Sequence, residues 1–183
     1  GIDWIEVGFE AAQVEWKPNR GGFVAKHPHD TPLKNELRMM QDGDKMVPTL
    51  PSGNTLTETK YHYGLYRRAG STDPWQAAVI GMASTMIKNS RELEGMKKRL
   101  CIPGTQKMAP SFAVYYQFQT TLVNKNNNEW FVWKIAQGTW ITSEEYAVAR
   151  ELAKQVAAGS VKTAQPDGGE ATGSGSALDE EVL

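Results

Sequence analysis

A chain of 183 residues with a formal net charge of −1 has the length of one domain, and its single cysteine, Cys101, excludes an intramolecular disulfide framework. No apolar run reaches the roughly 18 residues of a membrane-spanning helix, and no signal-peptide pattern is present at the start. We therefore expect one folded domain in a reducing compartment, with no membrane partner.

Short alternations of apolar and polar residues open the chain and predict one or two strands over residues 2–16. Pro32 stands where a helix would begin, and the apolar spacing after it predicts a short helix over residues 32–41. Alternation then predicts an extended segment after the LPSGNT turn, in which one face carries Thr57, Thr59, Tyr61, Tyr63 and Leu65 and the other carries Lys60, His62, Tyr66 and Arg68. The apolar segment WQAAVIGMA predicts the next strand.

The second half of the chain has clearer patterns. Ser84 or Thr85 can cap a helix that runs to about Leu100, with an apolar stripe formed by Met86, Leu93, Met96 and Leu100. The segments FAVYYQFQTTLV and EWFVWKIAQGTWI predict a hairpin that turns at NKNNN, with Phe131 and Trp133 in the core. Thr142 and Glu145 have the spacing of a capping box, which predicts a closing helix that ends at Gly159.

This order of elements predicts a mainly β protein with some α structure. We expect a five-stranded, partly open β-barrel of the oligonucleotide/oligosaccharide-binding (OB) type, with a helix between strands and a closing helix. The folded domain should span residues 1–161, and residues 162–183 should form a flexible acidic tail.

Charge is segregated along the chain. Residues 1–161 carry 19 Lys and Arg (20 minus Lys162) against 16 Asp and Glu (21 minus five tail acids), and residues 60–134 carry 11 against 4. Residues 164–183 have no basic residue and are rich in Gly and Ser. This pattern indicates a domain that binds a polyanion and a tail that competes with it. The alternative interpretation is an ordinary globular domain with a solubilising tail.

Motifs of common enzyme classes are absent: the sequence has no P-loop, GxGxxG, GxSxG, HExxH or CxxC. The segment from His27 to Asp30 contains two histidines, but no second Cys/His cluster follows, so a polar turn explains it better than a metal site does. We therefore expect a protein that is not an enzyme, with no cofactor and no bound metal.

The predicted hairpin and the central helix supply candidate nucleic-acid contacts. Single strands are held by bases that stack on aromatic rings and by cations that follow the phosphates. The stacking candidates, which we expect on the surface, are Tyr115 and Trp130. The candidate phosphate contacts are Lys60, Arg67, Lys88, Arg91, Lys98, Arg99 and Lys134.

Three segments, STMIKNSRELEGMKK, the NKNNN–WFVW hairpin and the closing helix, together resemble bacteriophage OB-fold single-stranded DNA-binding proteins over about residues 50–160. The resemblance implies sequence-independent DNA binding in phage replication or recombination, in the cytoplasm of the infected bacterium. It also implies a tail that docks replication or recombination proteins through Asp179, Glu180, Glu181, Val182 and Leu183. Homo-oligomers would be compatible with this function.

A virion structural or assembly protein is the rival interpretation, because a β-rich fold and a flexible tail also serve that role. Such a protein would form large assemblies without nucleic acid and would show no salt-dependent DNA affinity.

Overall fold

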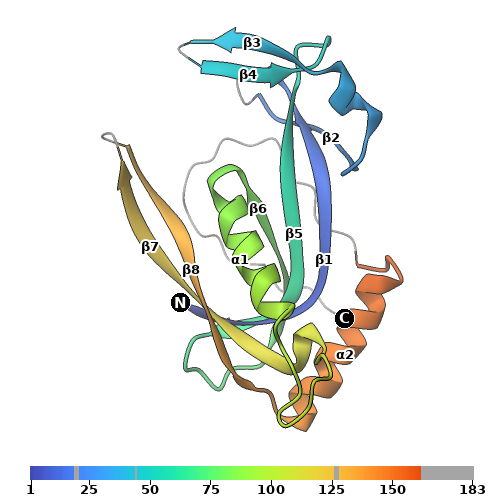
Figure 1. The fold of residues 1–183 in the computed structure, drawn as a ribbon, viewed down its shortest axis with the longest axis vertical. Coiled ribbons are helices and arrows are strands. Elements are labelled where there is room, and N and C mark those ends of the chain that lie inside the picture. The colour runs from blue at the N-terminus through green and yellow to red at the C-terminus, as the bar shows by residue number, and fades with distance from the viewer. Residues whose placement is uncertain (19–20, 44, 126–127, 162–183) are drawn as a thin grey trace, which may run out of the picture.

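The computed structural model describes residues 1–18, 21–43, 45–125 and 128–161. Its strands form one antiparallel sheet in the order β3-β4-β5-β1-β7-β8, with β2 paired to β1 and β6 paired to β5 (Figure 1). The strands are β1 (Ile2–Trp16), β2 (Phe23–Pro28), β3 (Arg38–Asp42), β4 (Lys45–Thr49), β5 (Thr55–Arg68), β6 (Gln76–Ala83), β7 (Val114–Lys125) and β8 (Asn128–Trp140). Two α-helices accompany the sheet, α1 (Ile87–Lys97) and α2 (Ser143–Ala157).

The centre of the sheet is a long ribbon, which we call the β1–β5 ribbon. Its two strands pair along their whole length, from Ile2 opposite Arg68 to Trp16 opposite Thr55. The register shifts between Glu6 and Gly8, which marks a β-bulge. Because the bulge adds one residue to β1, Glu6 and Phe9 lie on the same face of the ribbon, although simple alternation would separate them.

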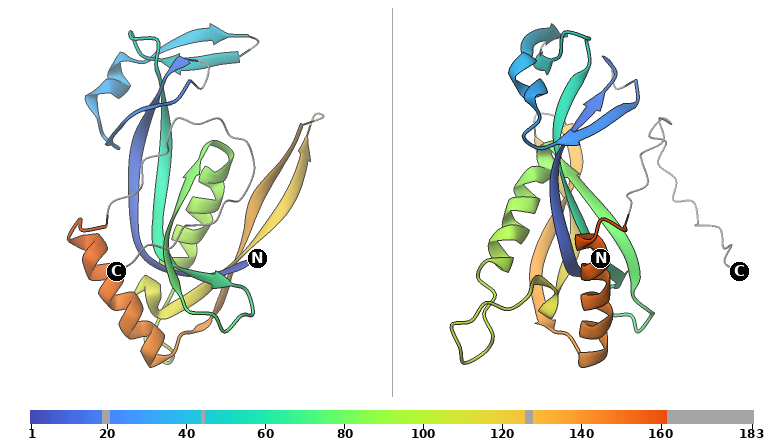
Figure 2. Two further views of the ribbon diagram at one scale, coloured as in Figure 1. Left: turned by 180° about the vertical axis from the view of Figure 1, so that it is seen from behind. Right: turned by 90° about the vertical axis from the view of Figure 1, so that its right-hand side faces the viewer.

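The two helices cover opposite faces of the β1–β5 ribbon (Figure 2). On the α1 side, Trp4 packs with Leu93 of α1 and with Phe118 of β7. On the α2 side, Ile5 packs with Leu65 and with Ala149 of α2. The alternation of Trp4 and Ile5 along β1 therefore divides the hydrophobic core into two layers, one under each helix.

Several expected elements are confirmed. The predicted β7–β8 hairpin forms, and both hydrogen bonds of the capping box at Thr142 and Glu145 are present. The apolar stripe of α1 faces the core on the hairpin side, with Leu93 and Leu100 buried there. The helix itself starts at Ile87 without a side-chain cap from Ser84 or Thr85.

Two expectations about the fold are wrong. The described residues form a mainly β, antiparallel structure as expected, but their sheet has eight strands and does not close, where a five-stranded, partly open barrel was expected. The helix expected over residues 32–41 is only a 3-10 turn, Pro32–Glu36, and Arg38–Asp42 is β3. Pairing with β4 decides the conformation of residues 38–42, because the ladder satisfies backbone groups that a lone helical turn would leave open. The expected acidic tail lies outside the described residues. No helix within the described ranges is long and apolar enough to cross a membrane.

A glycine in β5 permits the close packing of the ribbon. A Cβ added at Gly64 would overlap the Trp4 ring and the Ile5 carbonyl, whereas one added at Gly81 in β6 would stand 3.6 Å from the Tyr61 ring. We expect Gly64→Ala to lower the free energy of unfolding by about 1–3 kcal/mol, because overpacking forces the core to shift. Gly81→Ala should be close to neutral in the same urea titration. Equal effects of the two substitutions would contradict this packing.

Candidate nucleic-acid interface

Helix α1 lies between the β1–β5 ribbon and the β7–β8 hairpin (Figure 1). Toward the ribbon, Ser90 bonds His62 and Lys97 bonds Glu6. Toward the hairpin, Leu93 packs in the core and the Asn89 amide donates to the Trp133 carbonyl. The remaining side of the helix carries the exposed side chains of Lys88, Arg91 and Glu92.

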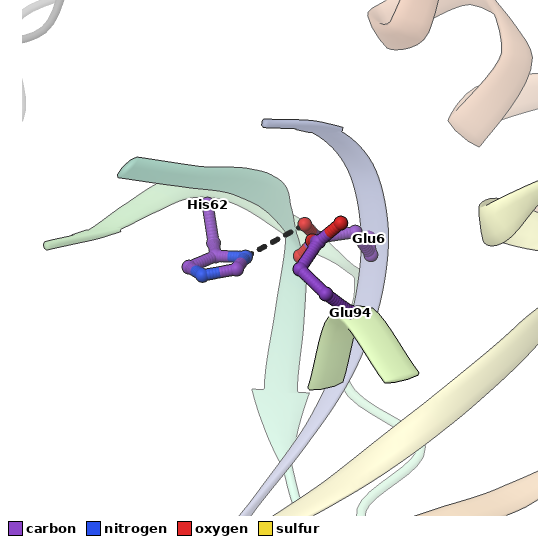
Figure 3. Close-up of side chains that lie close together, drawn as sticks. All are labelled: Glu6, His62 and Glu94. Carbon is purple, nitrogen blue, oxygen red and sulfur yellow. Dashed lines mark hydrogen bonds and ion pairs between the residues drawn. The ribbon is translucent and has the colours of Figure 1, made fainter. Parts of the chain in front are cut away.

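A buried polar cluster joins α1 to the ribbon, and its members are Glu6, His62, Ser90, Glu94 and Lys97 (Figure 3 shows Glu6, His62 and Glu94). The Glu6 carboxylate is completely buried and accepts hydrogen bonds from Trp4 Nε1 at 2.7 Å and from Lys97 Nζ at 3.1 Å. His62 Nδ1 lies 2.8 Å from Glu6 Oε1, and His62 Nε2 lies 2.8 Å from Ser90 Oγ. Donors from three elements thus satisfy the buried carboxylate, as a buried charge requires.

The chemistry of this cluster is structural. Ser90, His62 and Glu6 stand in the order of a hydrolase relay, but all three are completely buried, so no substrate reaches the Ser90 hydroxyl. Donor atoms of Glu6, His62 and Glu94 lie within 4.8 Å of one another, which would suit a cation. The Lys97 ammonium group forms ion pairs with the carboxylates of Glu6 and Glu94 and so takes the place of a metal cation. The cluster therefore locks α1 onto the ribbon.

The outer face of α1 and of the turn after it is mainly basic, with one exposed acid, Glu92, among its cations. Its exposed cations are Lys88, Arg91, Lys98 and Arg99. Among the described residues, no acid lies within 4.0 Å of any of these four side chains. Helical spacing gathers them on one side, opposite the buried polar cluster and the apolar stripe. Four unpaired cations on one face form a surface for an anionic ligand.

Two exposed aromatic rings flank this basic face, and neither is a predicted stacking residue. Phe9 is 40% exposed, and the bulge in β1 turns it toward α1, where Lys97 Nζ lies 5.4 Å from its ring centroid. Phe131 is 66% exposed and shares a hairpin face with Trp133, which packs against the α1-side core. The expectation that Phe131 is a core residue is wrong, because the hairpin extends beyond the part of the sheet that α1 covers.

Two predicted phosphate contacts on β5 are engaged within the protein. Lys60 is mostly buried, lies 3.9 Å from Glu58 and is directed toward the Phe9 ring. Arg67 stacks on Trp75 and bonds Glu145 at 3.2 Å. Although burial raises the pKa of Glu145, hydrogen bonds from Thr142 and Trp75 and the charge of Arg67 hold it below the ordinary value. Arg67 thus ties β5 to the first turn of α2.

The predicted hairpin contacts lie on the other face of the sheet. Trp130 and Lys134 alternate with Phe131 and Trp133, so their side chains are directed away from α1. Trp130 is half-buried, and its indole nitrogen is buried with no partner among the described residues. Tyr115 is also half-buried: its ring covers Gly138, where an added Cβ would lie 2.5 Å away. The structure therefore separates these three residues from the basic face of α1.

The five tail residues from Asp179 to Leu183 lie outside the described residues. No curated protein and no solved structure matches the chain. Residues 1–162 match the family model described as Pam3 phage gp34-like protein. This match covers the whole sheet and both helices, so the chain belongs to the Pam3 phage gp34-like family of bacteriophage proteins.

Proposed function

We propose that this phage protein binds single-stranded nucleic acid through the α1 side of the molecule, without sequence preference and without catalysis. The observation that carries the proposal is the set of four exposed cations on the outer face of α1 and the turn after it, none of which has an acidic partner among the described residues. A role in DNA replication or recombination in the infected cell would follow from this binding.

Three features support single strands over duplex. Phosphates attract cations in either form, but only splayed bases stack on aromatic side chains. Phe131 offers a largely exposed ring on the α1 side, and Phe9 offers a second, partly exposed ring. Helix α1 also lies between two strands, β6 and β7, as the proposed relation to OB-type proteins would have it.

The test is a titration of the full chain with a fluorescent oligo-dT, a duplex of equal length and an abasic strand, each at two salt concentrations. We expect the affinity to be highest for oligo-dT, lower for the abasic strand and lowest for the duplex. For each ligand the affinity should fall as the salt concentration rises. Phe131→Ala should weaken oligo-dT binding by about 1–3 kcal/mol and leave the abasic strand unaffected. Equal affinity for duplex, or affinity independent of salt, would reject the proposal.

A virion structural or assembly protein is the second candidate, and the β3–β4 arm favours it. The arm extends from one end of the β1–β5 ribbon (Figure 1). Met39, Met40 and Met46 on it are each more than half exposed, and adjacent residues Met39 and Met40 lie on opposite faces. An arm with exposed methionines on both faces is suited to contacts with other protein surfaces. Large assemblies in the absence of nucleic acid would support this candidate.

A further inference from the structure

We propose that an apolar groove on the α2 side of the sheet binds Leu178, Val182 and Leu183 of the same chain. The groove has a volume of about 660 Å³ and lies over β5 and β6, beside α2. It is on the face of the sheet opposite α1, so its occupant does not meet the basic face. This inference is therefore independent of the proposed function.

Small residues make the floor of the groove. Ala77, Val79, Gly81 and Ala83 alternate along β6 and all line it. Their cross-strand neighbours Tyr61 and Thr59 continue the floor on β5. Because glycine and alanine leave space above the backbone, the floor can receive side chains of leucine or valine size.

The walls of the groove are apolar. Leu152 and Val156 of α2 form one side, and Trp16 at the end of β1 lines it as well. Tyr61, in the floor, is held by a contact with Lys26, whose Nζ lies 4.4 Å from the ring centroid. Burial and then the nearby Glu10 charge raise the pKa of the Tyr61 hydroxyl, so this part of the floor stays uncharged. An uncharged, apolar site selects an aliphatic occupant.

The chain itself arrives at this groove. Val161 is the last described residue, and it lines the groove beside Val156. Residues 162–183 lie outside the described residues, and their sequence places a Gly/Ser-rich stretch before Leu178. Leu178 follows Val161 by 17 positions, and the chain between them can span at most about 60 Å at roughly 3.5 Å per residue. A tether that starts at the groove wall gives its apolar residues a local concentration of about millimolar.

The acids between these apolar residues would remain in water. Asp179, Glu180 and Glu181 separate Leu178 from Val182, so the three aliphatic side chains can enter the groove while the carboxylates stay solvated. Binding through so few side chains is reversible. Occupation of the groove would therefore hold these residues until a protein partner with higher affinity removes them.

The test uses methyl NMR of the full chain labelled at Leu and Val methyl groups. We expect nuclear Overhauser contacts from Val182 and Leu183 to Val79, Leu152 and Val156. Substituting Leu178, Val182 and Leu183 together with serine should abolish these contacts and shift the Val79 and Leu152 methyl signals. The matched control replaces Asp179 with Asn and Glu180 and Glu181 with Gln, and should retain the contacts.

A second variant tests the groove from the other side. Gly81→Leu fills the floor, since a Cβ there makes only ordinary contacts, and should displace the segment while Val148→Ser, outside the groove, should not. If Gly81→Leu does not fold, the triple-serine chain, which changes no described residue, still decides the question. Identical Val79 and Leu152 methyl signals in the wild-type and triple-serine chains would overturn the proposal. Contacts that disappear on dilution would assign the groove to a second copy and also overturn it.

Discussion

Lys97→Met is expected to lower the free energy of unfolding by about 3–5 kcal/mol, because it removes the cation from two carboxylates in the buried polar cluster. Glu6 is fully buried and cannot regain water in the folded state. Trp4 Nε1 still donates to it and His62 Nδ1 still lies within hydrogen-bond distance, but the ammonium group that bridges Glu6 and Glu94 is lost. The measurement is urea unfolding followed by circular dichroism.

The neighbouring residue provides a matched control. Lys98 is exposed and has no acidic partner among the described residues, so Lys98→Met should change stability by less than about 0.5 kcal/mol. Adding Glu6→Gln to Lys97→Met should recover part of the loss, because the unpaired charge is then removed as well. If Lys97→Met costs no more than Lys98→Met, the cluster does not lock α1 onto the ribbon.

Replacing the four cations on the outer face of α1 with glutamine is expected to remove most of the affinity for single strands. Each lost phosphate contact reduces the log–log salt slope by about 0.7, so four contacts reduce it by about 3. Near 0.1 M salt this corresponds to a loss of roughly several hundred-fold in affinity. The measurement is oligo-dT binding across a salt series with Lys88, Arg91, Lys98 and Arg99 all changed to Gln.

The control for this variant changes the net charge equally but leaves α1 intact. Four glutamine substitutions on other elements serve this purpose, at Lys17, Lys34, Arg38 and Arg150. We expect their salt slope to stay close to that of the wild-type chain. Circular dichroism should show that both quadruple variants are folded. Equal losses of oligo-dT affinity in the two variants would mean that overall charge, rather than the face of α1, determines binding.

Local sequence patterns predicted several elements correctly because the interactions that form these elements lie within one short segment of the chain. The capping box at Thr142 and the apolar stripe of α1 depend on residues three or four apart. The two faces of β5 depend on alternation alone, and Tyr63 and Leu65 do pack together under α2. In each case the pattern involves residues that are close in sequence, so the periodicity is enough to predict the element and its buried face.

The features that the sequence did not predict depend on contacts between distant parts of the chain. Glu6, His62 and Lys97 come from three elements, and Glu6 is separated by 91 residues from Lys97. A lone histidine in a strand gives no signal that it will be buried against a helix. The bulge that aims Phe9 at α1 also has no clear sequence mark. For Phe131, alternation predicted the correct face of the hairpin but not the exposure of the side chain, because α1 does not extend far enough to cover that position.

The central place of β1 in the sheet has a consequence for synthesis on the ribosome. Its neighbours are made in sequence: β2 pairs with Ala12–Trp16, β5 then pairs along its whole length, and β7 pairs with Ile2–Trp4 last. Ile2 meets Phe118, so 116 residues separate the two partners (118 minus 2). Such distant pairing raises contact order and slows folding. Until β7 emerges, the first residues of β1 carry an unpaired backbone edge, and a chaperone that shields nascent strands would act at that stage.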